Sequence, residues 1–346
     1  MIIKENYGIE HIQMLQNNYK KDPSLLERVL YAFGLLEAIT RVGMPYVFKG
    51  GTCLLLLTET PMRLSTDIDI FVEPGIDVEK YILEASHLFP FKYFEEQARI
   101  GKNKVEKRHF KFVYDSPLQK GEFYILLDIV FAEIPYEKIL VKEINQEMLL
   151  VDHIPIYTKI PSAECLLGDK LTAFAPHTTG ILFNKNKELE IIKQMFDVAG
   201  LINFITDYEL IANTYERVVS EELAYRGLFL KKEDVLIDTI NSAICIIGKG
   251  TIFKEEYPLF LRGIKSIGGH ILGMKYSGEI AAQQACKVLY LASCLLTNSK
   301  YKPIIDAHLY ANVSIATSKY NKLAYIRKQS LEAYGYLVEA VHLLDE

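Results

Sequence analysis

The sequence lacks paired cysteines and long uninterrupted apolar runs. Its five cysteines are an odd number and none belongs to a C-x-x-C pair, so we expect neither a disulfide framework nor a structural zinc site. The amino-terminal residues have no apolar core of signal-peptide length, and polar side chains interrupt the most apolar later stretch, residues 281–296. These features predict a cytoplasmic protein that is not exported and does not span a membrane.

Positive charge is also in short supply. Among 346 residues, 39 Lys and Arg face 44 Asp and Glu, a formal charge of −5, which argues against a chain that coats nucleic acid or an anionic membrane non-specifically. Contact with RNA would therefore need a local basic patch. The best candidate for such a patch is a run of basic residues, Lys102, Lys104, Lys107 and Arg108. An ordinary solvated loop would explain this run equally well.

The first part of the chain mixes helix and strand signals. Apolar residues make up 50% of the chain and charged residues 24%, the balance of a folded globular protein long enough for two domains. A helix is expected over 22–43, because Asp22 can cap its start and Pro23 suits its first position. Further expected elements are strands over 46–49, 67–72, 108–114 and 123–131 and a helix over 78–89.

In the second part the strand signals fade, and apolar residues recur at spacings of three and four. The predicted helical segments are 161–175, 188–205, 208–226, 232–247, 278–297, 302–317 and 322–344. The stretch 150–161, which holds Pro155 and Pro161, separates the two patterns. We therefore predict an α+β protein, with a mixed-sheet domain over 1–150 and an α-helical bundle domain over 151–346.

Two aspartates, Asp67 and Asp69, lie two positions apart on an expected strand. Strand side chains alternate, so both carboxylates should leave the same face. At a separation of about 5 Å they would repel by roughly 3 kcal/mol at an effective dielectric constant of about 20, a cost that a bound divalent cation reverses. Magnesium suits two oxygen ligands that leave positions open for water and substrate phosphate. The alternative is a turn cap beside a solvent-facing strand end.

The turn Gly50-Gly51-Thr52 precedes this pair. Two glycines let the backbone pass close to a ligand, and the helix that follows offers N–H groups and a positive dipole end to an anion, with the Thr52 hydroxyl beside it. A P-loop is excluded because Gly-Lys-Ser/Thr is absent, and a dinucleotide turn is excluded because G-x-G-x-x-G is absent. What remains is a strand, a glycine turn, a helix and an Asp-x-Asp strand. A triphosphate would fit at the glycine turn.

That order resembles nucleotidyltransferases of the DNA polymerase β type, in which a Gly-Ser or Gly-Thr turn holds the triphosphate and Asp-x-Asp binds the metals. The text Phe-Lys-Gly-Gly-Thr at 48–52 and Arg-Leu-Ser-Thr-Asp-Ile-Asp-Ile at 63–70 resembles one branch, the AbiEii/AbiGii toxin family. The resemblance implies a nucleotidyltransferase core, with Asp67 and Asp69 as catalytic metal ligands. It implies nucleotide binding by Lys49, Gly50, Gly51, Thr52, Arg63 and Ser65.

The resemblance continues in the second part, where Gly-Asp-Lys-Leu-Thr-Ala-Phe at 168–174 is similar to the family's Lys-[Leu/Ile]-x-Ala motif. Lys170 is then a catalytic and nucleotide-binding lysine. Its apolar neighbours predict a packed helix with Lys170 at the edge and partly exposed. Lys-Gln-Met-Phe-Asp at 193–197 is similar to a later family region and adds Asp197 as a catalytic acid, although Gln194 stands where an acid is usual.

Two-metal chemistry calls for a third carboxylate. It usually lies on a neighbouring strand, holds the catalytic metal and draws the proton from the acceptor hydroxyl. Asp128 lies in the most apolar strand of the first domain, where a lone buried carboxylate would be costly, so it is the candidate. A salt bridge or an exposed strand face is the alternative. The rival acid, Asp115, is explained by an ordinary turn beside Ser116 and Pro117.

By resemblance, we expect Mg²⁺-dependent transfer of a nucleoside monophosphate from an NTP to an acceptor, with two Mg²⁺ ions held by Asp67, Asp69 and Asp128. The helical domain should close the nucleotide cleft. The expected role is the toxin of a type IV toxin–antitoxin or abortive-infection system in phage defence, with tRNA as a candidate acceptor and an antitoxin as a partner. Two alternatives stay open: a small-molecule nucleotidyltransferase of the antibiotic-modifying kind, and a non-catalytic nucleotide- or antitoxin-binding module.

Overall fold

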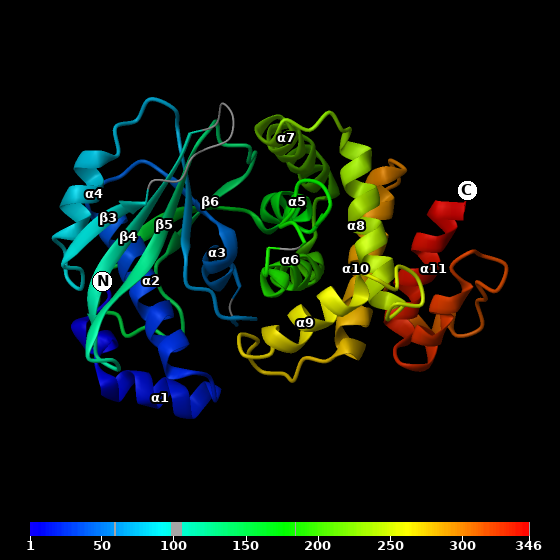
Figure 1. Ribbon diagram of the computed structural model, residues 1–346, viewed down its shortest axis with the longest axis horizontal. Coiled ribbons are helices and arrows are strands. Elements are labelled where there is room, and N and C mark those ends of the chain that lie inside the picture. Colours follow the sequence, from blue (N-terminus) through cyan, green and yellow to red (C-terminus); the bar gives the residue numbers. More distant parts are fainter. Residues whose placement is uncertain (59, 98–105, 184, 346) are drawn as a thin grey trace. The chain divides into compact units, whose positions relative to one another are not determined.

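The computed structural model divides into two compact units (Figure 1). It describes residues 1–58, 60–97, 106–183 and 185–345. The first unit comprises Met1–Ser162 together with Gly269–Met274, and the second comprises Ala163–Gly268 and Lys275–Glu346. The boundary at 150 expected from the sequence lies inside the first unit, and the roles assigned to the two domains stay predictions.

A mixed five-stranded sheet lies at the centre of the first unit, with strand order β1-β2-β5-β4-β3. Strands β2 and β5 run parallel, and the other neighbouring pairs run antiparallel. The five strands are β1 Val47–Lys49, β2 Ile68–Val72, β3 Tyr93–Gln97, β4 Glu106–Ser116 and β5 Gly121–Phe131. A separate hairpin pairs β6 (Ile139–Glu143) with β7 (Tyr157–Pro161). The strands expected from the sequence are confirmed; β3, β6 and β7 were not predicted, because their residues lack a regular apolar alternation.

One face of the five-stranded sheet is apolar, because every second residue of its central strands is apolar. Ile70, Ile129 and Phe110 lie on this face and are at most 1% exposed. Helix α2 packs against it, since the Tyr31 ring of α2 stacks on the Tyr114 ring of β4 with centroids 3.5 Å apart. The helices of this unit are η1 Lys4–Tyr7, α1 Ile9–Tyr19, α2 Pro23–Arg41, α3 Gly50–Leu57 and α4 Glu79–Ser86.

Helix α2 begins and ends where the sequence predicts. The Asp22 carboxylate accepts hydrogen bonds from the backbone N–H groups of Ser24 and Leu25, at 2.9 and 3.2 Å, which satisfies donors that the first turn leaves open. Gly43 follows the last turn with φ of +73°, a left-handed conformation that favours glycine. Local chemistry therefore sets both ends of this helix.

A short segment from late in the chain, Gly269–Met274, belongs to the first unit. The N–H of Leu64 donates to the carbonyl of His270 at 2.9 Å, and Arg63 forms an antiparallel bridge with Ile271. The segment thus adds a strand-like return next to the residues that precede β2. The backbone around Arg63 is fixed by a contact that no local sequence pattern reveals.

The second unit is helical, as expected, so the α+β class of the whole chain is confirmed. Helix α10 lies at its centre and contacts α6, α8 and α11. All five cysteines are buried. The helices are α5 Ala163–Ala173, α6 Glu188–Leu201, η2 Ile202–Phe204, α7 Tyr208–Arg226, α8 Lys232–Ile247, α9 Tyr257–Ile267, α10 Gly278–Leu296, η3 Ala307–Tyr310, η4 Asn321–Lys328 and α11 Leu331–Asp345.

Two helix predictions near the carboxyl end were wrong. The expected helix over 302–317 is reduced to the 3₁₀ turn η3, which starts only after Asp306, whose side chain caps it through the N–H of His308. The expected helix over 322–344 is split into the 3₁₀ helix η4 and the α-helix α11. Within the described part of the chain, no helix is both long and apolar enough to cross a bilayer.

Candidate active site

A row of polar side chains crosses the five-stranded sheet on the face opposite the apolar one. Strand register aligns one residue from each strand, and register partners project to the same face. All are only partly exposed. We call these residues the polar row; in strand order they are Lys49, Asp69, Asp128, His109 and Gln97.

The two glycines between β1 and α3 leave room for side chains that converge on the turn. Gly50 has φ of +80°, and a Cβ there would overlap the Asp69 carboxylate. A Cβ on Gly51 would lie 2.7 Å from Ser65 Oγ and 2.8 Å from Arg63 Nη2. The structure thus brings together the glycine turn, Arg63, Ser65 and the Asp69 carboxylate of the polar row. The motif resemblance had assigned these residues to one nucleotide site.

Thr52 and Lys49 flank this turn. Thr52 is fully buried, and its hydroxyl donates to the backbone carbonyl of Asp67 at 2.6 Å. Through this contact the hydroxyl fixes the backbone before β2, and the expectation that it lies beside a phosphate stays a prediction. The Lys49 ammonium lies 4.1 Å from the centre of the Phe71 ring, a cation–π contact at one end of the polar row.

Asp67 lies one residue before β2, so strand alternation does not fix its direction. Its carboxylate Oδ1 is 3.6 Å from Nη2 of Arg28 on α2, and its side chain is 48% exposed. The sequence placed Asp67 and Asp69 on one strand face. The structure places Asp69 in the polar row and Asp67 at the strand entrance, next to the helix that covers the apolar face.

Asp128 is held by a histidine that the sequence analysis did not select. His109 Nδ1 lies 2.7 Å from Asp128 Oδ1, with side chains 14% and 28% exposed. Because a carboxylate only accepts hydrogen bonds, Nδ1 carries the proton. The two residues are 19 positions apart and meet only because β4 and β5 pair in this register. The signal that could have found His109 is the hairpin register, which aligns the apolar residues of the two strands.

The donor atoms of this region suit a hard cation. Asp69 and Asp128 are register partners on parallel strands and supply carboxylate oxygens. Among the residues that the structure describes, no group of three or more His, Cys, Asp and Glu side chains is already arranged to hold a metal. Magnesium is usually held by one or two carboxylates plus substrate phosphates and water, not by an all-protein cage. The residues therefore fit a metal that arrives with a nucleotide.

Lys170 and Asp197 meet inside the second unit. Lys170 Nζ lies 2.8 Å from Asp197 Oδ2 and donates to Gln194 Oε1 at 3.2 Å. Lys170 is 5% exposed and Asp197 is fully buried. The expectation of a partly exposed lysine at a helix edge was wrong, because α6 covers α5 with the two side chains that bind its ammonium. The motifs around Lys170 and Asp197 thus form one ion pair.

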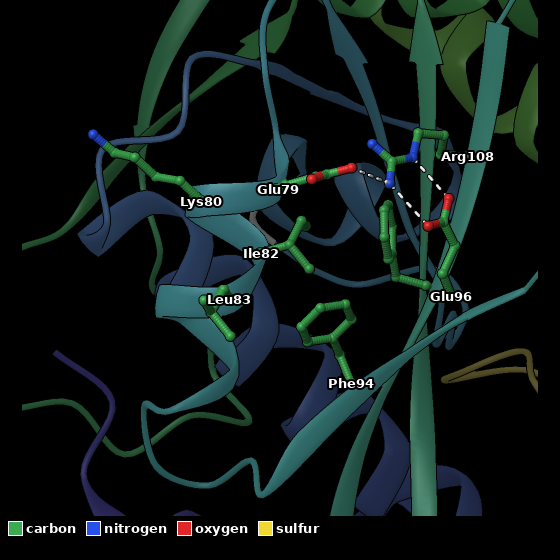
Figure 2. Close-up of a pocket in the computed structure, with 8 residues that line it drawn as sticks. Glu79, Lys80, Ile82, Leu83, Phe94, Glu96 and Arg108 are labelled. Atoms are coloured by element: carbon green, nitrogen blue, oxygen red, sulfur yellow. Dashed lines mark hydrogen bonds and ion pairs between the residues drawn. The ribbon is translucent and has the colours of Figure 1, made fainter.

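The basic run predicted as an RNA contact is partly accounted for by ion pairing; Lys102 and Lys104 lie outside the described residues. Arg108 binds both carboxylate oxygens of Glu96, at 2.7 and 2.8 Å, and lies 3.3 Å from Glu79. Figure 2 shows these three residues at the rim of a pocket of about 300 Å³ on the apolar-face side of β4. Two carboxylates thus already engage the Arg108 guanidinium.

Comparison with known proteins identifies a family for this chain. The family model described as "Nucleotidyl transferase AbiEii toxin, Type IV TA system" matches residues 35–263, more than half of the chain. No curated protein matches the chain. Among solved structures, JHP933 from Helicobacter pylori is 15% identical with a TM-score of 0.44, covering 79% of this chain and 93% of that one. A protein from H. pylori assigned provisionally as a nucleotidyltransferase is also 15% identical, with a TM-score of 0.43 and coverage of 79% and 96%.

Proposed function

Because this chain belongs to the AbiEii family of nucleotidyltransferase toxins of type IV toxin–antitoxin systems, we propose that it transfers a nucleoside monophosphate from an NTP to an acceptor and releases pyrophosphate. The observation that supports the proposal is that the glycine turn contacts the polar row. At that point Gly50 lies against the Asp69 carboxylate and Gly51 against Arg63 and Ser65. The groups proposed to bind the triphosphate therefore lie beside Asp69, which is proposed to bind the metal.

The triphosphate is expected on the amides of Gly50 and Gly51, with Arg63, Ser65 and Lys49 around it. Arginine and the start of α3 favour negative charge there. Thr52 would stabilise this triphosphate site by fixing the backbone of Asp67 through the hydrogen bond from its hydroxyl. These residues would hold the α-phosphate in line for attack and supply positive charge where pyrophosphate leaves.

Asp69 and Asp128 are the residues that would hold Mg²⁺. Asp67 would join them only by giving up its contact with Arg28. When bound, the metal would neutralise phosphate charge and favour in-line displacement. Asp128 is the group proposed to take the proton of the acceptor hydroxyl, and the His109 Nδ1 proton orients its carboxylate. Lys170 is proposed to bind nucleotide phosphate, which would require it to exchange its contacts with Asp197 and Gln194.

The proposed biological role is that of a cytoplasmic toxin whose acceptor is tRNA, opposed by a cognate antitoxin in phage defence. The test uses each NTP labelled at the α- or γ-phosphate, with total tRNA and Mg²⁺. Transfer of a nucleoside monophosphate predicts α-label in RNA and γ-label in pyrophosphate. Label in a small product would instead identify a small-molecule nucleotidyltransferase, and binding without turnover a non-catalytic module.

Asp69→Asn is expected to lower the transfer rate at least about 100-fold, because the shape is kept and the metal-binding charge is lost. Asp115→Asn is the matched control. Asp115 belongs to the same sheet, but its side chain is 71% exposed and pairs with Lys92 at the surface, so this change should leave the rate within about twofold. Equal rates in the two variants would contradict the proposed site. Thermal melts of both variants should show the same folded state.

A further inference from the structure

The carboxyl-terminal part of the second unit carries a local excess of positive charge. Residues 307–331 contain Lys319, Lys322, Arg327 and Lys328 and no Asp or Glu, in a chain whose net charge is −5. All four cations are exposed. This segment lies beyond the span 35–263 that the family model matches, so the family assignment says nothing about its role.

An open pocket of about 320 Å³ lies against this segment. The residues that line it include two aromatic residues, Phe253 and Tyr320, together with Asn241, Ile244, Lys319 and Lys322. Phe253 is 39% exposed and has φ of +58°, a conformation that bulky residues rarely adopt. The loop therefore presents an aromatic ring to solvent at a cost in backbone energy.

The cations are attached to an ordered backbone. Leu323 and Ile326 of η4 are fully buried, and the Tyr325 hydroxyl donates to the carbonyl of Ile247 on α8. The Lys319 ammonium lies 5.0 Å from the centre of the Tyr320 ring. The pocket thus places a ring face and a cation side by side on a backbone that is anchored to the helical unit.

We propose that this surface binds a single-stranded segment of RNA, with one base in the pocket and the adjoining phosphates on Lys319 and Lys322. Exposed aromatic rings stack bases, an amide can hydrogen-bond a base edge, and lysines neutralise the backbone. An acidic peptide would use the lysines but leave the two rings and the amide without a function. The identification of this RNA as the acceptor rests on the proposed nucleotidyl transfer; RNA binding itself does not.

The test measures fluorescence anisotropy of a labelled 12-nucleotide single-stranded RNA with the full chain, without NTP, over a range of salt concentrations. Lys319→Glu/Lys322→Glu should weaken binding at least about tenfold at 0.1 M salt and reduce the salt slope by about 1 to 2. Tyr320→Ala should weaken binding about 5- to 100-fold and leave the salt slope unchanged. The matched control, Lys265→Glu/Lys275→Glu, changes the net charge equally at exposed lysines of the same unit and should bind within about twofold of the original chain.

Two results would overturn the proposal and indicate general polyanion binding instead. One is that the Lys265→Glu/Lys275→Glu control loses as much binding as Lys319→Glu/Lys322→Glu. The other is that Tyr320→Ala has no effect while heparin competes fully. No binding of RNA by the original chain would overturn it as well. Single-stranded DNA of the same sequence tests the preference for RNA. The binding assay contains no NTP and involves no turnover, so a defect in RNA binding is measured separately from a failure of the proposed transfer chemistry. Thermal melts exclude unfolding of the variants.

Discussion

Asp128 lies in a strand whose neighbouring side chains are apolar, and its carboxylate is oriented by His109 from the adjacent strand. A partly buried carboxylate needs a hydrogen-bond donor, and a donor on a rigid strand also fixes the direction of the carboxylate. The geometry therefore gives His109 a positioning role that no motif in the sequence indicated.

His109→Leu should weaken Mg²⁺ affinity about 10- to 100-fold, because the Asp128 carboxylate loses the donor that orients it. His109→Asn places an amide N–H near the position of Nδ1 and should recover most of that affinity. His109→Gln, whose amide corresponds to the other ring nitrogen, should recover less. Mn²⁺ titration followed by electron paramagnetic resonance measures this without turnover, and equal affinities in Leu and Asn variants would contradict the positioning role.

At the scale of elements, helices α5 and α6 are joined by the ion pair of Lys170 and Asp197. Both side chains are removed from water, and Gln194 provides a further acceptor for the ammonium. A buried ion pair contributes little net stability compared with apolar residues, but leaving one partner alone is costly. Lys170 and Asp197, which the motif resemblance predicts to be catalytic, therefore also hold α5 and α6 together.

Lys170→Ala should lower the free energy of unfolding by about 3–5 kcal/mol, since it leaves the Asp197 carboxylate buried without its cation. The double variant Lys170→Met/Asp197→Leu should recover much of this loss, because no charge is then buried. Urea unfolding of the two variants and of the original chain measures both effects. A double variant less stable than Lys170→Ala would show that the ion pair is not the cause.

The turn after α5 is held by Asp238 of α8. The Asp238 carboxylate accepts hydrogen bonds from the His177 backbone N–H at 2.8 Å and from Thr178 Oγ1 at 2.8 Å, and pairs with His177 Nδ1 at 2.7 Å. Burial lowers the pKa of His177, but Asp238 and Glu256 outweigh it and raise the pKa above the ordinary value. The protonated imidazole thus favours the folded state.

Because the folded-state pKa of His177 is raised, its stabilising effect is complete below the unfolded pKa of about 6.5 and is lost as the pH rises through the folded pKa. His177→Ala should therefore lower Tm more at pH 6 than at pH 8.5, by on the order of 1–2 °C for a partly exposed group. Differential scanning calorimetry at both pH values measures this, with His87→Ala as an exposed control. An equal loss at the two pH values would exclude the charge effect.

At the scale of the whole molecule, the two units are not consecutive in sequence. The first unit is completed by Gly269–Met274, whose Ile271 is fully buried and bridges to Arg63. The chain enters the helical unit at Ala163, returns to the first unit near 269, and leaves it again. The segment that carries Arg63 thus depends on residues that follow it by about two hundred positions.

A fragment of residues 1–162 should be less stable than the same fragment extended by a flexible linker and residues 269–274. The return segment supplies backbone hydrogen bonds to 62–64 and an apolar side chain, and both are lost in the shorter fragment. Denaturant unfolding compares the two, and Ile271→Asp in the extended fragment should remove most of the gain. Identical unfolding curves would show that the segment does not stabilise this unit.

The sequence by itself determined the features that depend on near neighbours. Caps, glycine turns and apolar alternation act within a few residues, so the ends of α2, the strands β1, β2, β4 and β5, and most helices of the second unit could be predicted. The motif text also indicated the family. Elements without such signals could not be predicted. They include α1, β3, α9 and the broken helices near the carboxyl end.

Tertiary structure decided what depends on register and packing between distant residues. It aligned Asp69, Asp128 and His109 in one row, directed Thr52 to a backbone carbonyl, and buried Lys170 against Asp197. A one-residue shift of β2, β4 or β5 would move Asp69, His109 or Asp128 to the other face of the sheet, although the local sequence would be unchanged. Residue types at a site can therefore be read from a sequence, whereas their partners are fixed only by how the strands and helices pair.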